Sequence, residues 1–443
     1  MISDDYCKLY LGIAREDITP LLGGRLFGYN DHTFSDNVHD RLQITALYFV
    51  NGDTKVMLLN ATVGEVQTAL AKRIREKVAG ELQIPVEACI LTTTHTHTAP
   101  VVMSMTGWGD IDTGYVETIF EPKILKAAKA AIQNTVYVKM GVAAGTSLTG
   151  INRRQLNPDN TISLRQNPWG PFNPEMTVMS FADADGNIIA NLIHYGAHAT
   201  AAGQCTWISR DWPGVMTDRL EDISGGITVF LQGAAGDVGP RLANGCTTSG
   251  KKGNPAEAMK CAMEHGSLAA RDAVRIFKDI RKYEDVDLTL CSKEIHIPLQ
   301  QRIPLEEAEK EYEIYKDSKR GTKAYIKQYY KDVIDAYANG LEEQEFESIH
   351  QSIIKVGDVA MVCFSYELFS EIAMRISQAS KIPYTISVCY TNGADSYFVT
   401  EDAFCRGGYE VAAHECVGAQ HRVPDGDWYL LTETLKNLEQ LEQ

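Results

Sequence analysis

The 443-residue chain is 44% hydrophobic and carries a formal net charge of −16, from 58 acidic and 42 basic residues. This charge repels phosphate backbones and anionic membranes, so we expect no nucleic-acid partner. The chain contains no apolar stretch of roughly 18 residues, so we expect no transmembrane segment, and its first residues lack the basic and apolar pattern of a signal peptide. We therefore expect a globular, cytoplasmic protein that acts on a small-molecule substrate, and a homo-oligomer is compatible with the sequence.

Short apolar, β-branched runs alternate with helical patterns along the chain. The runs predict strands at 42–50, 54–63, 87–94, 226–233 and 385–393. Helical periodicity is found at 66–82 and 119–134. This alternation predicts an α/β fold in which helices cover the faces of a mixed sheet.

Residues 304–348 differ in composition, because they are dense in charge and tyrosine and have helical periodicity. We expect a helical arm here, broken near Arg320-Gly321 and ended at Asn339-Gly340. A solvated face without chemistry is the favoured interpretation of its charges. Segments with candidate site residues lie on both sides of the arm. We therefore expect a single catalytic domain over residues 1–443, with the arm as an insertion.

Four segments join an apolar strand to small, polar and metal-binding residue types. They are "TTTHTHTAP" (92–100), "NLIHYGAHATAAG" (191–203), "ISRDWPG" (208–214) and "FLQGAAGDVGPR" (230–241). Open α/β sheets place their functional sites at strand ends, where loops present side chains on a rigid scaffold. We expect the candidate site among these segments.

The histidines of these segments suggest a metal site. His95 and His97 would leave a strand on the same face, as a metal ligand beside a proton-handling neighbour or, alternatively, as a hydrogen-bonded surface pair. His194 and His198 are four residues apart, but Gly196 and the absence of a glutamate argue against the helical H-E-x-x-H motif. Zinc favours imidazole nitrogen and carboxylate oxygen with one position left for water. One histidine from each segment with an acidic ligand from elsewhere would satisfy it.

Eight segments, taken in order, resemble the signature segments of the neutral/alkaline ceramidase family. They are "GIAREDITP" (12–20), "VHDRLQITALYF" (38–49), "TTTHTHTAP", "INRR" (151–154), "GAHATAAG" (196–203), "RDWPG" (210–214), "GDVGPR" (236–241) and "GGYE" (407–410). The resemblance spans nearly the whole chain. It implies a zinc-dependent hydrolase similar to enzymes that cleave the amide bond of N-acyl sphingosine.

The resemblance also implies a set of metal ligands. Carried over position by position, zinc would be held by His95, His198, Glu367 and Tyr397. His194 would then either support a ligand from behind or be structural. Glu367 stands in "CFSYELFSE", where a strand runs into a helix, and Glu371 is the weaker candidate for the same role.

Three further residues would complete the pocket that the resemblance implies: His97, Arg153 and Tyr409. Zinc-bound water would attack the carbonyl, and His97 would pass a proton to the leaving group. Arg153 and Tyr409 would donate hydrogen bonds to the developing oxyanion. Arg154 competes with Arg153 for this role.

The chain departs from the family in ways that bear on the substrate. The family's G-D-V-S-P-N is "GDVGPR" here, so Gly239 replaces a serine sometimes assigned as nucleophile. Because the chain ends at Gln443, we expect no carboxy-terminal immunoglobulin-like domain. Four tryptophans near the site segments suit a small polar, sugar-like substrate: Trp108, Trp169, Trp207 and Trp212. The alternatives are a metal-dependent enzyme of another class acting on a carbohydrate derivative and a non-catalytic ligand-binding homologue.

Overall fold

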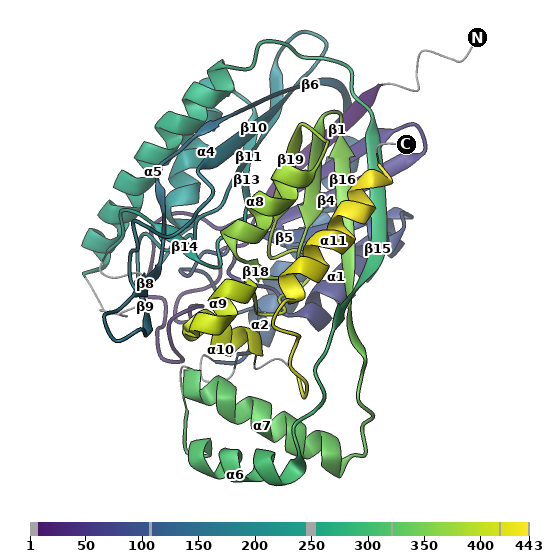
Figure 1. The fold of residues 1–443 in the computed structure, drawn as a ribbon. Helices are drawn as coiled ribbons and strands as arrows, with labels where there is room; N and C mark the ends of the chain where they lie inside the picture. The colour runs from purple at the N-terminus through teal and green to yellow at the C-terminus, as the bar shows by residue number, and fades with distance from the viewer. Residues whose placement is uncertain (1–7, 106–108, 245–253, 320–321, 416–417, 442–443) are drawn as a thin grey trace.

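The computed structural model describes residues 8–105, 109–244, 254–319, 322–415 and 418–441. Its larger sheet has eight strands, which in spatial order are β13 (Ile227–Gln232), β11 (Ile188–Tyr195), β10 (Glu175–Ala182), β6 (Val136–Thr146), β1 (Leu9–Asp17), β3 (Gln43–Asn51), β4 (Thr54–Ala61) and β5 (Cys89–Thr93). The inner pairs are antiparallel, whereas β4–β5 and β11–β13 are parallel. The predicted mixed α/β fold is confirmed (Figure 1).

A second sheet of four strands packs on the first. Its order is β15 (Leu288–Pro298), β16 (Phe346–Val356), β17 (Val359–Cys363) and β19 (Tyr384–Val388), with β17 and β19 parallel. Leu58 of β4 and Met361 of β17 belong to the apolar cluster between the sheets. Met57 and Leu59 belong to a cluster on the opposite face of the larger sheet. The predicted strands read as continuous apolar runs because both of their faces are buried.

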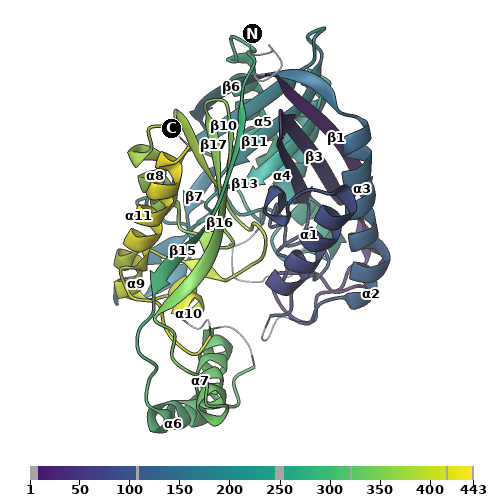
Figure 2. The same ribbon diagram turned by 90° about the vertical axis from the view of Figure 1, so that its right-hand side faces the viewer.

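Helices cover the outer face of each sheet. The larger sheet is covered by α1 (Thr68–Leu82) and α3 (Glu121–Gln133) at one end and by α4 (Asp211–Ser224) and α5 (Pro255–Lys278) at the other; the smaller sheet is covered by α8 (Ser370–Ala379) and α11 (Gly426–Glu439). Figure 2 shows the resulting order of layers: helices, two sheets, helices. Among the described residues, no helix combines the length and apolar character needed to cross a membrane.

Short elements lie near one end of this sandwich. They are the pairs β7 (Gly150–Asn152) with β14 (Val238–Pro240), β18 (Glu367–Leu368) with β20 (Tyr397–Phe398), β8 (Arg154–Leu156) with β9 (Ile162–Leu164) and β2 (Asn37–Val38) with β12 (Trp207–Ile208), and the helices α2 (Thr113–Tyr115), a π turn (Val116–Phe120), α9 (Glu401–Arg406) and α10 (Tyr409–Glu415). The parallel strands β4, β5, β11, β13, β17 and β19 all have their carboxyl ends here. This end of the sandwich is therefore where an open α/β fold places its site.

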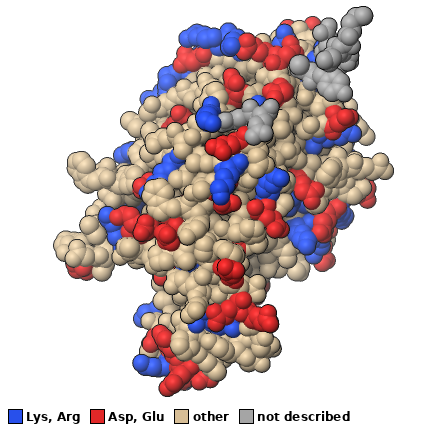
Figure 3. All heavy atoms as spheres, turned by 45° about the vertical axis from the view of Figure 1, so that its right-hand side comes forward, with Lys and Arg blue, Asp and Glu red and all other residues tan. Residues whose placement is uncertain are grey.

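The helical arm leaves the body where β15 and β16 diverge, at the paired residues Pro298 and Phe346. It consists of α6 (Leu305–Tyr315) and α7 (Thr322–Ala338) and forms a lobe that projects from the body (Figures 1 and 3). The predicted end at Asn339-Gly340 is correct, because Gly340 has a φ of +61° and closes α7. The predicted break at Arg320-Gly321 lies outside the described residues. Residues 346–348 belong to β16, so the arm ends earlier than predicted.

Candidate active site

Strand ends from both sheets bring the candidate residues together. His95 follows β5, His198 follows β11, and Glu367 lies just beyond β17. The small parallel pair β18–β20 places Glu367 directly beside Tyr397, since the two residues are partners in its register. These positions are far apart in the sequence and meet only because the parallel strands end at the same edge.

The nitrogen atoms of three histidines and a carboxylate oxygen converge in this buried space. Nε2 of His97 lies 3.2 Å from Nε2 of His95. One oxygen of Glu367 lies 3.0 Å from Nε2 of His198 and 3.6 Å from Nε2 of His95. Two overlapping groups of these atoms are close enough to bind one ion: His95, His97 and His198, and Glu65, His95 and Glu367. The cluster could therefore hold a metal ion.

The hydrogen bond at the far side of the His198 ring sets its tautomer. Its Nδ1 lies 3.1 Å from the carbonyl oxygen of Val238, so the ring proton is assigned to Nδ1. Nε2 is then an acceptor that faces a carboxylate oxygen of Glu367. Two lone-pair atoms in contact repel each other unless a proton or a cation lies between them. This pair fits a metal ion, and such an ion would replace the hydrogen bond that Arg153 now donates to Nε2 at 3.0 Å.

Glu65 is the main residue that the sequence interpretation missed. It follows β4, which pairs in parallel with the strand that leads to His95. One of its carboxylate oxygens lies 3.5 Å from Nδ1 of His95, on the side of the ring away from the convergent atoms. Nδ1 of His95 has no hydrogen-bond partner among the described residues, so a small approach by this carboxylate would let it accept from Nδ1 and orient the ring as a metal ligand. Its only sequence signal is an acidic residue just beyond a predicted strand.

Burial changes the protonation of the whole cluster. Desolvation lowers the pKa of His95, His97 and His198 well below the ordinary value, and Arg153 lowers all three further, whereas Glu367 acts in the opposite direction on His95. Desolvation and the adjacent Glu367 raise the pKa of Glu65 well above its ordinary value. The imidazoles are therefore neutral, which is the form that binds metals. A cation bound here would also relieve the repulsion between the two carboxylates.

The guanidinium of Arg153 reaches across the site, and each of its three nitrogen atoms forms a hydrogen bond. It donates to the hydroxyl of Tyr397 at 2.9 Å and to Glu410 at 3.1 Å, besides its bond to His198. Desolvation lowers the pKa of Arg153, but Tyr397, Glu410 and Glu367 outweigh it and raise the value overall. Arg154 turns away and pairs with the other oxygen of Glu410 at 2.6 Å. The structure therefore brings Arg153 to the site rather than Arg154.

Aromatic rings enclose the cluster. Tyr390, which the sequence interpretation also missed, stacks on the His95 ring at 4.1 Å and donates to Glu367 at 3.3 Å. Tyr409 contacts the edge of Tyr397, with ring centroids 5.8 Å apart. Tyr409 thus lies beside the site. The adjacent Glu410 was not singled out, although it pairs with both arginines of the "INRR" segment.

His97 occupies the more open side of the cluster. Its ring is half-buried, whereas His95 and His198 are almost fully buried. Gly28 packs against this ring, and a Cβ atom there would lie 2.2 Å from Nδ1 of His97. The φ of Gly28 is +97°, a conformation that favours glycine. His97 therefore combines contact with the convergent atoms and access to solvent, as a proton-transfer residue requires.

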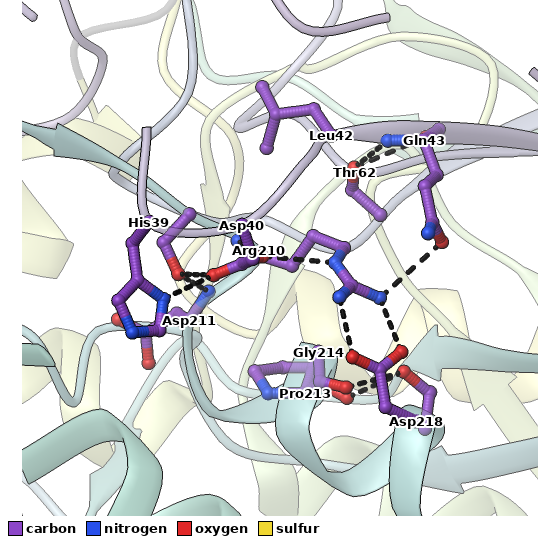
Figure 4. A network of polar contacts seen from close by, with 12 residues as sticks. His39, Asp40, Leu42, Gln43, Thr62, Arg210, Asp211, Pro213, Gly214 and Asp218 are labelled. Atoms are coloured by element: carbon purple, nitrogen blue, oxygen red, sulfur yellow. Dashed lines mark hydrogen bonds and ion pairs between the residues drawn. The ribbon is translucent and has the colours of Figure 1, made fainter. Parts of the chain in front are cut away.

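At the start of α4, Asp40 and Arg210 form a polar network with Asp218 (Figure 4). Asp40 accepts hydrogen bonds from the backbone and side chain of Arg210 and from the hydroxyl of Ser209. The carbonyl of Ser209 in turn accepts bonds from Thr96 and Thr98, which flank His97. The segments around Asp40 and Arg210 that resemble the family thus support the site without entering it.

Asp211 connects the same segment to the other histidine loop. Its carboxylate accepts from the backbone amides of Ala201 and Ala202, at 2.9 Å each. The indole of Trp212 donates to the backbone carbonyl of His198 at 2.8 Å. Residues 209–212 therefore hold both histidine loops in place.

Other candidate residues lie elsewhere. His194 bonds to the carbonyl of Ser387 and joins the two sheets, which agrees with a structural role. Glu371 pairs with Arg375 and lines a separate cavity of about 570 Å³. Gly239 is buried in β14, opposite Ile151.

The tryptophans do not surround the site, contrary to our expectation. Trp212 is fully buried in the core against Phe230, because its large ring fills the space between α4 and the sheet. Trp207 stacks near His39. Trp169 is 93% exposed at the rim of the separate cavity. Trp108 lies outside the described residues.

Comparison with known proteins identifies the family. Residues 9–286 match the family described as neutral/alkaline non-lysosomal ceramidase, N-terminal. The chain belongs to this family. No curated protein matches the sequence.

Solved ceramidases share the fold. Neutral ceramidase from Pseudomonas aeruginosa superposes with a TM-score of 0.72 at 16% identity, over 97% of this chain and 73% of that one. A ceramidase complexed with C2 gives a TM-score of 0.68 at 15% identity, over 97% and 74% of the two chains. The sequence-based family assignment is confirmed, and at these identities the structures support the fold alone.

Proposed function

We propose that this ceramidase-family protein is a zinc-dependent hydrolase that cleaves the amide bond of a small polar N-acyl substrate. The observation that carries the proposal is the convergence of acceptor atoms from His95, His198 and Glu367 in a buried space. In this structure the guanidinium of Arg153 supplies positive charge beside these atoms, and a metal ion would supply it directly between them. Imidazole and carboxylate are ligands that zinc favours.

Tyr397 completes the proposed set of ligands. It lies beside Glu367 in the strand register, and burial raises the pKa of its hydroxyl well above the ordinary value. Arg153, which donates to this hydroxyl, stabilises negative charge on the oxygen. A zinc ion bound by these residues supplies a Lewis acid and lowers the pKa of water to about 7.

The remaining residues position the substrate and move the proton. A metal ion on Nε2 of His198 would free the N–H that Arg153 now donates to that nitrogen, and this N–H could donate to the carbonyl oxygen of an amide as negative charge develops. A single well-placed donor of this kind contributes about 3 to 4 kcal/mol to the transition state. His97 is close to the ligand atoms and less buried than His95 and His198, so it can deliver a proton to the departing nitrogen. Tyr409 lies beside Tyr397, with ring centroids 5.8 Å apart, and is partly exposed.

The replacement of serine by Gly239 favours this reaction without a serine nucleophile. A glycine offers no nucleophilic group, so the attack falls to water. An ester of similar shape is a compatible second substrate, because the same residues serve both reactions.

The test is release of free amine from N-acyl amino sugars, N-acyl amino acids and short-chain ceramides by the zinc-loaded protein. His97→Ala should keep the metal and lower kcat by roughly 10²- to 10⁴-fold, the range for a lost general acid or base. His32→Ala is the control, because His32 is exposed and bonded to Asp31. Full activity in His97→Ala, or no hydrolysis of any substrate class by zinc-loaded protein, would contradict the proposal.

Gly239→Ser provides a second comparison on the same substrates. We expect no gain in kcat, because the proposed reaction does not use a hydroxyl at this position. A gain of tenfold or more would show that the site works through serine and would refute attack by water.

A further inference from the structure

Helix α7 of the arm contacts the body at α10, which carries the site residue Tyr409. Tyr325 of α7 lies with its ring centroid 6.2 Å from that of Tyr409, at an interplanar angle of 56°. Tyr409 in turn contacts the edge of Tyr397. Three tyrosine rings thus lead from the arm to a proposed metal ligand.

Tyr325 and Tyr409 are close enough for their hydroxyl groups to interact, as well as their rings. Desolvation raises the pKa of the Tyr409 hydroxyl well above its ordinary value, and a hydrogen bond with Tyr325 raises it further. Both rings also pack against the apolar cluster that contains Tyr397 and Val411. Tyr325 is therefore part of the wall that contains Tyr409.

The arm is fixed on the body at more than this one place. Tyr329, one turn further along α7, is buried and stacks on the ring of His421 at 4.0 Å. At the base of the arm, Gln420 accepts from the backbone of Gln344 and donates to its carbonyl. Ring stacking at Tyr329 and the hydrogen bonds between Gln420 and Gln344 attach the arm to residues 420 and 421 of the body. The position of Tyr325 is thus determined by the fold.

Exposure indicates which side a substrate approaches. His95, His198, Glu367 and Tyr397 are buried, whereas Tyr409 and Tyr325 are partly exposed. Two rings with hydroxyls at such a position present polar groups and a rigid barrier at once. On a path past these two rings, an extended alkyl chain would meet a barrier that a compact polar group would not.

We propose that Tyr325 is a specificity-determining residue, which forms with Tyr409 the side of the substrate channel that limits the acyl group to a short one. This inference rests on the proposed function, because it names the substrate class of the same site. The charges of the arm favour a solvated face without chemistry. The arm would then influence the substrate through Tyr325, the ring that it places beside Tyr409 of α10.

The test compares the kcat/KM values of the zinc-loaded protein for N-acetyl and N-octanoyl forms of one amine. We expect Tyr325→Ala to raise the value for the octanoyl form about tenfold relative to the acetyl form, mainly through a lower KM, since a pocket discriminates by about 10-fold or more per group excluded. Tyr325→Phe should keep the wild-type preference, because the ring is retained. Tyr312→Ala is the matched control, a tyrosine on α6 at the outer side of the arm.

A second variant and a second measurement test the role of Tyr325 independently of the proposed hydrolase activity. Tyr325→Trp should lower kcat/KM for the octanoyl form, because a larger ring narrows the channel. The rate at which a planar chelator such as 1,10-phenanthroline removes bound zinc should rise severalfold in Tyr325→Ala. An unchanged acyl preference and chelation rate in both variants would overturn the inference while hydrolysis by the wild type stands. If the wild type binds zinc but hydrolyses no amide, the proposed function fails and the chelation rates still decide the inference.

Discussion

Three residues at the site hold a backbone conformation that side chains seldom adopt. His95 has a φ of +57°, Tyr390 has +53° and Ser396, which precedes Tyr397, has +71°. Each such residue costs about 1 to 3 kcal/mol and persists only where the surrounding structure fixes it. Here the strain turns the imidazole and the phenol rings toward the convergent atoms. This concentration of strain is typical of a functional site.

Sequence reasoning found the histidines but not the residues that orient them. His95 and His198 were recognisable because polar, metal-binding residues rarely follow buried strands without a reason. Glu65 precedes His95 by 30 positions and meets it only through the parallel pairing of β4 with β5. Tyr390 lies in a turn with no spacing that marks it. Contacts made by strand pairing have no local sequence signal.

Glu65→Gln should weaken metal binding while leaving the fold intact. The amide keeps the shape of the carboxylate but loses the charge that orients Nδ1 of His95, and loss of such a partner typically lowers metal affinity 10- to 100-fold. Competition against a chromophoric chelator measures the change. Glu371→Gln is the control, since that carboxylate pairs with Arg375. Equal affinities in the two variants would assign Glu65 no role at the metal.

His265 should make the protein sensitive to acid. Burial lowers its pKa to about 3, whereas a histidine in the unfolded chain titrates near 6.5. Between these values the unfolded chain binds a proton that the folded chain does not, so the free energy of unfolding falls as the pH falls below about 6.5. The loss from this residue amounts to about 2 kcal/mol between pH 7 and pH 5.

His265→Leu tests this effect, because leucine fills a similar volume beside Trp212. Urea unfolding without added metal should show the variant losing about 2 kcal/mol less than the wild type between pH 7 and pH 5. His32→Leu, at an exposed position, should follow the wild type. The same pH dependence in His265→Leu and the wild type would refute the assignment.

At the scale of the elements, one short segment positions two loops that follow different strands. Residues 209–212 bond to the loop after β5 through the carbonyl of Ser209 and to the loop after β11 through Asp211 and Trp212. The segment is itself fixed by Asp40 and by the paired Arg210 and Asp218 (Figure 4). The geometry of the histidines therefore depends on a segment that contacts neither substrate nor metal.

Asp211→Ala should destabilise the protein and loosen the site together. It leaves the buried amides of Ala201 and Ala202 without an acceptor, which costs about 3 kcal/mol by the usual penalty for such groups. Chemical denaturation measures the loss, and metal affinity should fall in the same variant. Asp222→Ala, at an exposed position on α4, is the control. Unchanged stability, or lost stability with unchanged metal affinity, would contradict this role.

The long elements were predictable and the short ones were not. Apolar runs located β3, β4, β5, β13 and β19 to within a few residues, because strands buried on both faces leave a continuous pattern. The pair β18–β20 contains two residues in each strand, too few for any periodicity, yet it sets Glu367 beside Tyr397. Contact of the arm with α10 was equally hidden, since the sequence indicates a helix but not what it packs against.

At the scale of the whole molecule, the site ties both sheets together. His95 and His198 follow strands of the larger sheet, whereas Glu367 and Tyr397 follow strands of the smaller one. A metal held by all four would join the two halves of the sandwich across the cluster between them. Binding to the folded state alone raises stability by RT ln(1 + [L]/Kd), about 2.7 kcal/mol at a hundredfold excess over Kd. Zinc should therefore raise the melting temperature by several degrees.

The most direct measurement is the zinc content of the purified protein together with its melting temperature before and after zinc is added. We expect about one zinc per wild-type chain. His95→Ala and His198→Ala should retain less than about a tenth of that amount, with no rise in melting temperature on adding zinc. His194→Ala is the matched control and should keep its zinc. His95→Ala protein that holds a full equivalent of zinc, or wild-type protein that binds none and melts at the same temperature with or without it, would contradict the metal centre.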